Sequence, residues 1–171
     1  LAPWVKDSGV DPSGLGRWSW YLLEGNEGHR SRVISAYAPC GSAASENKTY
    51  YQQQARYIKI KGLKTNPKEM FRKDLLRQLR RWRKRGDRMV LMMDANEDAV
   101  DGVMCRQLGS GEIGMQEAVY STTGVKGPNT YFKGALAING IWVTTDIEVS
   151  SAAYLPYDPE LGDHRPVVAN I

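Results

Sequence analysis

Apolar and polar positions alternate along this chain in patterns that predict strands first, then helices, then strands again. Residues 17–24 are rich in aromatic side chains, and 30–38 alternate between apolar and polar. Because a Gly-Asn-Glu-Gly turn signal separates them, we expect a β-hairpin over 17–38. Residues 1–16 are rich in Gly, Pro and Asp and are expected to form a loop.

The middle of the chain has helical periodicity. Residues 49–60 predict one helix, and a longer helix is expected to begin at Pro67, since proline suits the first helical turn. Thr65 or Asn66 is expected to cap this second helix, and it should end near Gly86. Its apolar residues recur at three- and four-residue spacing and form one stripe: Phe71, Leu75, Leu76, Leu79 and Trp82.

A second group of strands follows the helices. Met89–Met93 is wholly apolar and has turn signals on both sides, which is typical of a buried central strand. After a loop with short helical pieces, further strands are expected at Thr130–Phe132, Ala137–Val143, Thr145–Ala153 and Val167–Ile171. This order predicts an α/β layered sandwich with a mixed sheet, in a single domain over 1–171.

The composition excludes several classes of protein. The 171 residues are 42% hydrophobic and 25% charged, which is ordinary for a globular domain and excludes general disorder. The longest apolar run is too short to span a bilayer, which needs about 20 residues. Two cysteines, Cys40 and Cys105, make neither a disulfide framework nor a zinc spacing. An intracellular setting, cytoplasmic or nuclear, is therefore favoured.

The net charge of +4 is unevenly distributed. Residues 68–88 carry a net charge of +7, and the rest of the chain carries −3. The long helix therefore concentrates the basic residues, above all Arg80, Arg81, Arg83, Lys84 and Arg85. These residues form either the solvated outer face of an amphipathic helix or a binding surface for nucleic acid.

Polar residues directly follow the apolar strand that ends at Met93. Asp94 and Asn96 therefore stand where a central strand is expected to end, a common position for residues that line a crevice. An aspartate there can orient a water or bind a metal, and an asparagine can donate a hydrogen bond to a phosphate oxygen. The alternative is a turn in which both side chains bond their own backbone.

Three further positions carry possible chemistry. The turn at 162–166 holds His164, one of only two histidines in the chain. It is either a reactive residue or part of a hydrogen-bonded turn. Asn139 lies within an apolar strand and must find a partner, for which a histidine imidazole is a candidate. Tyr37, at a strand end, is able to bond a phosphate oxygen.

Several short motifs share one order along the chain: Tyr37-Ala38-Pro39, a helix, Asp94-Ala95-Asn96, Thr130-Tyr131-Phe132, Ile138-Asn139-Gly140-Ile141-Trp142 and Asp163-His164-Arg165-Pro166. From about residue 17 to the end, this order and spacing resembles the endonuclease/exonuclease/phosphatase superfamily. That family includes pancreatic deoxyribonuclease, the apurinic endonucleases and the endonucleases of non-long-terminal-repeat retrotransposons. The resemblance implies a four-layer αββα sandwich and metal-assisted cleavage of phosphate esters.

The resemblance also implies roles for individual residues. Asp163 would be a ligand of Mg²⁺ or Mn²⁺, a hard cation that neutralises phosphate charge during in-line attack. His164 would stabilise the transition state or transfer a proton. Asp94 would orient or deprotonate the attacking water, while Asn96 and Tyr37 would contact the phosphate.

The sequence departs from the family at two points. Thr130 matches a supporting residue, but Asn139 stands where family members usually have an aspartate. An amide can hydrogen-bond His164, yet it cannot offset a positive charge on the imidazole. The family's N-terminal third, with its metal-binding glutamate, has no counterpart here, and Glu24 and Glu27 come too late in the pattern. We therefore expect an N-terminally truncated sandwich that associates with itself or with a second chain completing it.

Three functions follow as hypotheses. The first is a Mg²⁺- or Mn²⁺-dependent DNA endonuclease or nickase, because a basic helix suits a polyanionic substrate. The second is a catalytically weakened or inactive homologue that binds nucleic acid or a partner protein. The third is a phosphatase that acts on a small phosphate ester, since the same fold serves different substrates.

Overall fold

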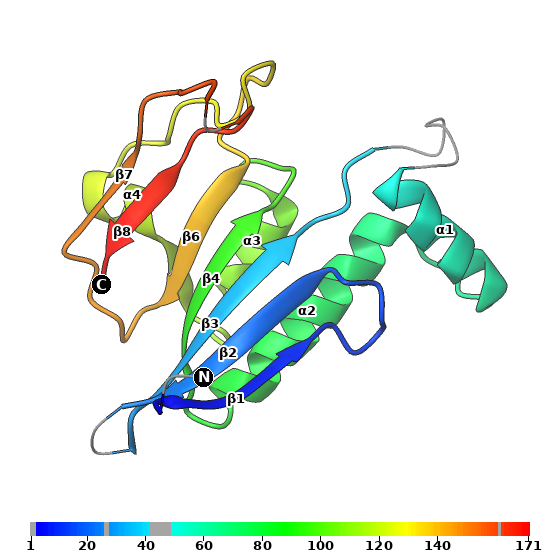
Figure 1. Cartoon of the computed structure of the whole chain (residues 1–171), viewed down its shortest axis with the longest axis horizontal. Coiled ribbons are helices and arrows are strands. Elements are labelled where there is room, and N and C mark those ends of the chain that lie inside the picture. Colours follow the sequence, from blue (N-terminus) through cyan, green and yellow to red (C-terminus); the bar gives the residue numbers. More distant parts are fainter. Residues whose placement is uncertain (1–2, 26–27, 42–48, 161) are drawn as a thin grey trace.

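The computed structural model describes residues 3–25, 28–41, 49–160 and 162–171. Within them, six strands form the main sheet in the order β1-β2-β3-β4-β6-β5 (Figure 1). The strands are β1 (Val5–Val10), β2 (Trp18–Glu24), β3 (Arg30–Tyr37), β4 (Arg88–Asp94), β5 (Met115–Glu117) and β6 (Asn139–Thr144). β3 and β4 are parallel and the other neighbours are antiparallel, so the predicted hairpin and mixed sheet are confirmed.

The remaining elements lie on either side of the main sheet. The helices are α1 (Tyr50–Ile60), α2 (Pro67–Arg83), α3 (Val103–Leu108) and α4 (Ala118–Thr123). The second sheet pairs β7 (Ser151–Tyr154) with β8 (Val167–Asn170). Among the described residues, no helix is long and apolar enough to cross a membrane.

The long basic helix α2 forms as its sequence predicts. The Asn66 side chain accepts a hydrogen bond from the Glu69 N–H, and Pro67 occupies the first turn. The predicted apolar stripe is buried, with Phe71, Leu75 and their neighbours packed on one face of the main sheet (Figure 1). Burial of each such side chain stabilises the fold by roughly 1.5–3 kcal/mol, so this face fixes the helix on the sheet.

The opposite face of the main sheet carries the second sheet. Val90, Val143 and Ile147 form a smaller core cluster there, and Ile141 packs against it. β8 contacts β6, and α4 contacts β5, β6 and β7. Helices, the main sheet and the second sheet thus follow one another, and α4 contacts both sheets, which confirms the predicted α/β class.

Three predictions about strands are wrong. Residues 5–10, expected within a loop, form the edge strand β1. Most of its residues are exposed and its apolar residues stand only at its ends, so the segment lacks an apolar alternation. Thr130–Phe132 makes only the single bridge Tyr131–His164, and of 145–153 only the end belongs to a strand.

Buried ion pairs connect α2 and its neighbours to the sheet. Asp87 is fully buried and accepts hydrogen bonds from Arg30 Nε at 2.8 Å and Arg32 Nη2 at 2.7 Å. The Arg32 guanidinium lies over the rings of both Trp20 and Trp82, at 4.2 and 4.4 Å from their centroids. A buried charge needs such partners, so the end of α2 is held at the start of β3 and β4.

Candidate active site

Three of the expected site residues form a row across the main sheet. Tyr37 of β3 is the register partner of Asp94 of β4, and Asp94 is the register partner of Asn139 of β6. Register partners point to the same face of a sheet. The ends of β3 and β4 therefore meet the start of β6 (Figure 1), and their register places three polar side chains side by side.

His164 adjoins one end of this row. Its Nδ1 lies 2.7 Å from the Asn139 Oδ1, and its ring centroid lies 5.2 Å from that of Tyr131. A backbone bridge between Tyr131 and His164 fixes the histidine segment beside the sheet. The sequence placed Tyr131 in a motif but did not indicate this ring contact.

Thr130 ties the same two segments together. Its Oγ1 accepts hydrogen bonds from the backbone N–H groups of Ile138 and Asn139, at 2.8 and 3.0 Å. Its carbonyl accepts from the Arg165 N–H at 2.7 Å. Since Thr130 is buried, it holds Asn139 and the residue after His164 in fixed relation, a supporting position.

Asp94 is partly buried, and its surroundings shift the pKa of its carboxyl in opposite directions. Burial raises the pKa of its carboxyl, while the Asn96 N–H bond and the charge of His164 lower it by less. The N–H bond from Asn96 to Asp94 Oδ1 measures 3.0 Å. A carboxylate with a raised pKa is a stronger base than an exposed one, which suits it to take a proton from water.

Asn96 lies beside the row and turns the chain away from β4. Its φ of 49° is in the left-handed region, which asparagine tolerates better than most residues. Its Nδ2 donates to the Ala38 carbonyl at 2.7 Å. Burial raises the pKa of the Tyr37 hydroxyl, and a hydrogen bond with the Asn96 side chain partly opposes this. Asn96 and Tyr37 are thus neighbours of Asp94.

The Asn139–His164 hydrogen bond determines what the imidazole can do. With the amide oxygen accepting, His164 Nδ1–H is the donor, and the neutral ring presents Nε2 as an acceptor. An amide holds the ring orientation but supplies no negative charge for an imidazolium. The amide therefore fixes the orientation of the ring and leaves Nε2 to exchange a proton.

Asp163 stands apart from the other carboxylates. Its backbone carbonyl accepts from the Phe132 N–H at 3.2 Å, and the residue is exposed. Among the described residues, no group of three or more His, Cys, Asp or Glu side chains gathers as a metal site would require. These side chains alone therefore do not fit a divalent cation. The assignment of Asp163 as a metal ligand stays a prediction.

The basic cluster of the C-terminal half of α2 lies at the other end of the sheet. Its last member, Arg85, precedes Arg88, which opens β4, whereas Asp94 closes that strand. Seven strand residues span about 20 Å at roughly 3.3 Å each. Two of its members are also ion-paired: Arg80 with Glu112 and Arg83 with Asp146. Arg80, Arg81, Arg83, Lys84 and Arg85 are thus not brought together with the candidate site.

Two basic residues lie much closer to the candidate site than this cluster does. The sequence analysis did not single them out. Lys68 and Arg72, one turn apart at the start of α2, line a hollow together with Asn96. Their four-residue spacing places them on one side of the helix. The only sequence signal for Lys68 and Arg72 was their four-residue spacing, within a helix that is already rich in basic residues.

Solved structures match nearly the whole chain. The 3′ phosphatase NExo from Neisseria, bound to a product DNA hairpin, has a TM-score of 0.67 and 17% identity, covering 97% of this chain and 70% of its own. An endonuclease/exonuclease/phosphatase from Bacteroides vulgatus has a TM-score of 0.64 and 18% identity, covering 96% and 64%. The human Nocturnin catalytic domain has a TM-score of 0.62 and 14% identity, covering 97% and 60%.

These likenesses establish the fold. The chain has the α/β fold of the endonuclease/exonuclease/phosphatase proteins, which is the deoxyribonuclease-like type that the motifs implied. It spans 60% to 70% of the length of these three solved chains. No protein-family model and no curated protein sequence matches it.

Proposed function

We propose that this protein hydrolyses phosphodiester bonds in DNA, as an endonuclease or nickase. The observation that carries the proposal is the row of Tyr37, Asp94 and Asn139 with His164 hydrogen-bonded at its end. It joins a partly buried base, an oriented imidazole and neutral donors at one end of a deoxyribonuclease-like fold. A neighbouring structure that holds a product DNA hairpin supports a nucleic-acid substrate.

Each side chain has its own role in the proposed reaction. Asp94, whose pKa is raised by burial, orients a water and takes its proton as the water attacks phosphorus. Tyr37 and Asn96 donate hydrogen bonds to phosphate oxygens, where negative charge develops in the transition state. As the water oxygen bonds to phosphorus, the bond from phosphorus to the leaving sugar oxygen breaks. His164, oriented by Asn139, takes a proton from solvent at Nε2 and donates it to that leaving oxygen. Thr130 accepts a hydrogen bond from the Asn139 N–H and so holds Asn139 in position beside His164.

The proposal includes a requirement of the reaction for a divalent metal ion, and this requirement can be measured. Mg²⁺ or Mn²⁺ follows from the resemblance, with Asp163 as the ligand. The described residues do not complete a site for such an ion, so no step above passes through it. Titration with each ion against a chelated control measures that requirement separately from the roles of the side chains.

The test of the proposed function is a comparison of two substrates. The protein is incubated with supercoiled plasmid and with a small phosphate monoester, each with Mg²⁺, with Mn²⁺ and with chelator. Metal-dependent conversion of plasmid to the nicked form, with little monoester cleavage, is the expected result. Cleavage of the monoester alone would favour the phosphatase alternative instead.

A second candidate function rests on Asn139. Because the amide cannot offset an imidazolium, the protein could bind nucleic acid and cleave it weakly or not at all. Salt-sensitive DNA binding without nicking under any metal condition would support this binding function and contradict the enzyme. Nicking that follows the metal would exclude a purely binding role.

A further inference from the structure

Aromatic side chains form a continuous series of ring contacts that begins at His164. The ring centroid of Tyr131 lies 5.2 Å from that of His164 and 5.3 Å from that of Phe132. The Phe132 centroid in turn lies 6.2 Å from that of Tyr157, with an angle of 23° between the two ring planes. The series therefore leads from the candidate site to two nearly parallel rings, Phe132 and Tyr157, which we call the aromatic platform.

Two loops hold the aromatic platform at the candidate site. Phe132 belongs to the loop before β6 and Tyr157 to the loop after β7, and both loops lie at the end of the molecule where β6 starts (Figure 1). The Arg165 guanidinium connects the two loops, because its Nε donates to the Asn129 carbonyl at 3.2 Å and its Nη1 to the Leu155 carbonyl at 3.0 Å. A surface that is held in this way before binding loses little conformational freedom when a ligand stacks on it.

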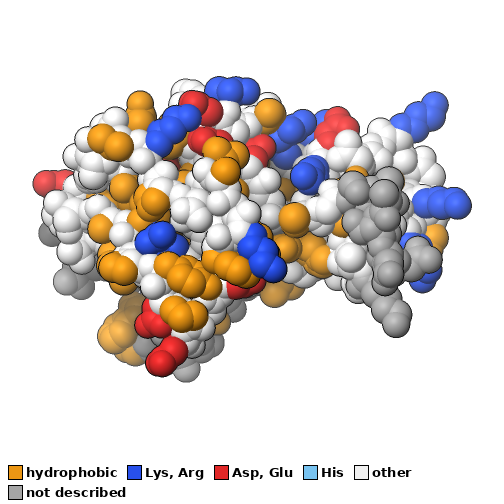
Figure 2. All heavy atoms as spheres, turned by 90° about the horizontal axis from the view of Figure 1, so that it is seen from above, with side chains coloured by type: hydrophobic (Ala, Val, Ile, Leu, Met, Phe, Trp, Pro, Cys, Tyr) orange, Lys and Arg blue, Asp and Glu red, His pale blue; other side chains and the backbone are white. Residues whose placement is uncertain are grey.

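The aromatic platform is exposed to solvent. Phe132 and Tyr157 are 47% and 36% exposed, and Leu136 and Leu155 of the same two loops are exposed as well. Figure 2 views this end of the molecule from above and shows hydrophobic side chains at the surface among basic and acidic ones. Exposed aromatic rings beside a candidate active site are available to stack on a flat ligand group.

The charges around the platform favour an uncharged ligand group over a phosphate. The loop after β7 carries three acidic residues, Asp158, Glu160 and Asp163. On the basic side, the Lys133 Nζ lies 4.9 Å from the Phe132 ring centroid. Acidic side chains repel a chain of phosphates, whereas a nucleobase is neutral and stacks through its face. The platform therefore fits a base, with Lys133 beside it to attract a neighbouring phosphate.

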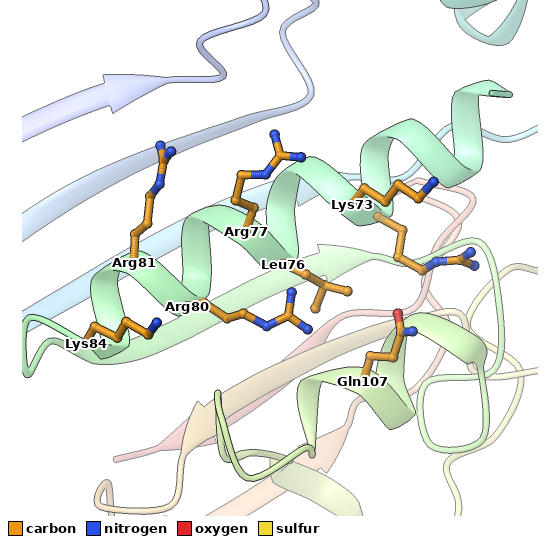
Figure 3. A pocket seen from close by; sticks show the side chains of 8 residues that line it. Lys73, Leu76, Arg77, Arg80, Arg81, Lys84 and Gln107 are labelled. Carbon is orange, nitrogen blue, oxygen red and sulfur yellow. The ribbon is translucent and has the colours of Figure 1, made fainter. Parts of the chain in front are cut away.

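The basic residues of α2 belong to a different surface. Figure 3 shows Arg80 of α2 facing Gln107 of α3, and the groove between these helices has a volume of about 440 Å³. Among the described residues, none that lines this groove also lines the hollow that contains Asp94 and Asn139. Recognition of a ligand close to the candidate site therefore depends on other side chains, and the platform provides them.

We propose that one unpaired base of the DNA substrate, near the phosphate bound at the candidate site, stacks on the aromatic platform of Phe132 and Tyr157. This inference rests on the proposed function and narrows its substrate to DNA with an unpaired nucleotide beside the cleaved bond. Inside a duplex each base face is covered by its neighbours, so an unpaired base is needed to offer a face to the protein rings. Such stacking tolerates any of the bases, because every base has a π face.

The experiment compares three labelled DNA hairpins that share one stem. The first carries a single unpaired thymine, the second carries an abasic spacer at that position, and the third is fully paired. Fluorescence anisotropy in the presence of chelator, which prevents metal-dependent cleavage, gives Kd for each hairpin. The spacer keeps the extra backbone unit and its phosphate, so the difference in Kd between the first two hairpins isolates the effect of the base.

Matched double variants show whether the platform binds that base. The platform variant is Phe132→Ala/Tyr157→Ala. The control variant, Trp4→Ala/Tyr120→Ala, also removes two exposed aromatic rings, one before β1 and one on α4. The ring-keeping variant, Phe132→Tyr/Tyr157→Phe, retains both rings and exchanges only the position of the hydroxyl group. Thermal unfolding checks that each variant is folded.

We expect the unmodified protein to bind the thymine hairpin at least about fivefold more tightly than either other hairpin, the lower end of what one stacked base contributes. The platform variant should lose this preference, whereas the control variant and the ring-keeping variant should retain it. Equal binding of the thymine and spacer hairpins by the unmodified protein, a preference that survives in the platform variant, or an equal loss in the control variant would overturn the inference. If the platform variant does not fold, Tyr157→Ala should reduce the preference more than Tyr120→Ala.

Plasmid nicking by the unmodified protein separates failure of this inference from failure of the proposed function. Nicking with metal, but without a preference for the unpaired thymine, refutes only the platform. A preference that depends on the platform, without nicking under any metal condition, refutes the proposed function and leaves the platform as a binding site. The two measurements are independent, because binding is measured with chelator and nicking with metal.

Discussion

The Asn139 amide occupies the position in which a carboxylate would stabilise a protonated His164. Its Oδ1 lies 2.7 Å from the imidazole Nδ1, so the ring is oriented without a negative partner. At the scale of single residues, we therefore expect the charge at this one position to limit the rate of the proposed reaction.

The first prediction is that Asn139→Asp accelerates DNA cleavage. A carboxylate of almost the same size keeps the hydrogen bond and stabilises the imidazolium, so kcat should rise on the order of 10²-fold. Single-turnover cleavage of a labelled duplex measures the change. Asn139→Ala, which removes both the charge and the hydrogen bond, should be slower than the unmodified protein. An unchanged rate in Asn139→Asp would show that His164 acts without this partner.

The second prediction is that Asp94→Asn stabilises the fold near neutral pH. Burial raises the pKa of Asp94 in the folded state above 3.8, so the ionised carboxylate is penalised at higher pH. The amide keeps the bond from the Asn96 N–H and carries no charge. The gain in unfolding free energy should be full above the raised pKa and should vanish as the pH falls below about 4. A gain independent of pH would contradict this cause.

Sequence reasoning selected several residues that the structure brings together, and their roles in a site stay predictions. Tyr37, Asp94 and Asn139 were selected from short motifs, and the strand register then placed them in one row. Lys68 and Arg72 were missed. Their proximity to Asn96 depends on where α2 begins against the sheet, which periodicity does not specify.

At the scale of elements, α2 is the part that its sequence predicted best. Pro67, the asparagine cap and the apolar stripe are local signals, and all act within one helix. The edge strand β1 was missed because its pairing with β2 comes from backbone hydrogen bonds and not from side-chain pattern. Gly9, for instance, lies against the Trp20 ring, where a Cβ would be 2.7 Å from Cζ2.

The third prediction concerns the buried ion pair that connects the end of α2 to the main sheet. Asp87→Asn leaves Arg32 buried without a full counter-charge, so unfolding free energy should fall by about 3–5 kcal/mol. Asp146→Asn is the matched control, because Asp146 pairs with Arg83 at the surface. Exposed pairs contribute at most about 1 kcal/mol. Urea unfolding measures the unfolding free energy of both variants. Equal decreases in the two would mean that burial of the ion pair does not determine how much its loss destabilises the fold.

At the scale of the whole molecule, the second sheet covers only part of the main sheet. On that face, Tyr21 of β2 and Met92 of β4 are 48% and 41% exposed. The chain also spans 60% to 70% of the solved structures that share its fold. Association with a second copy, or with another chain that completes the sandwich, stays a prediction for this face.

The fourth prediction is that the protein is larger than a monomer at micromolar concentration. Burying Tyr21 and Met92 against a partner removes apolar surface from water, which favours association. Light scattering should give a mass above 19.1 kDa, and Tyr21→Ser/Met92→Ser should shift the mass towards the monomer. A monodisperse monomer would contradict this expectation.

The most direct test of the whole account compares the two histidines of the chain. His164 is hydrogen-bonded to Asn139 at the candidate site, whereas His29 lies in the turn before β3, at the far end of that strand. With divalent metal present, His164→Ala should slow plasmid nicking by at least about 10², the scale of general acid–base catalysis. His29→Ala should nick at the unmodified rate. Equal nicking by both variants, or no nicking by the unmodified protein, would contradict the proposal that this site hydrolyses phosphodiesters.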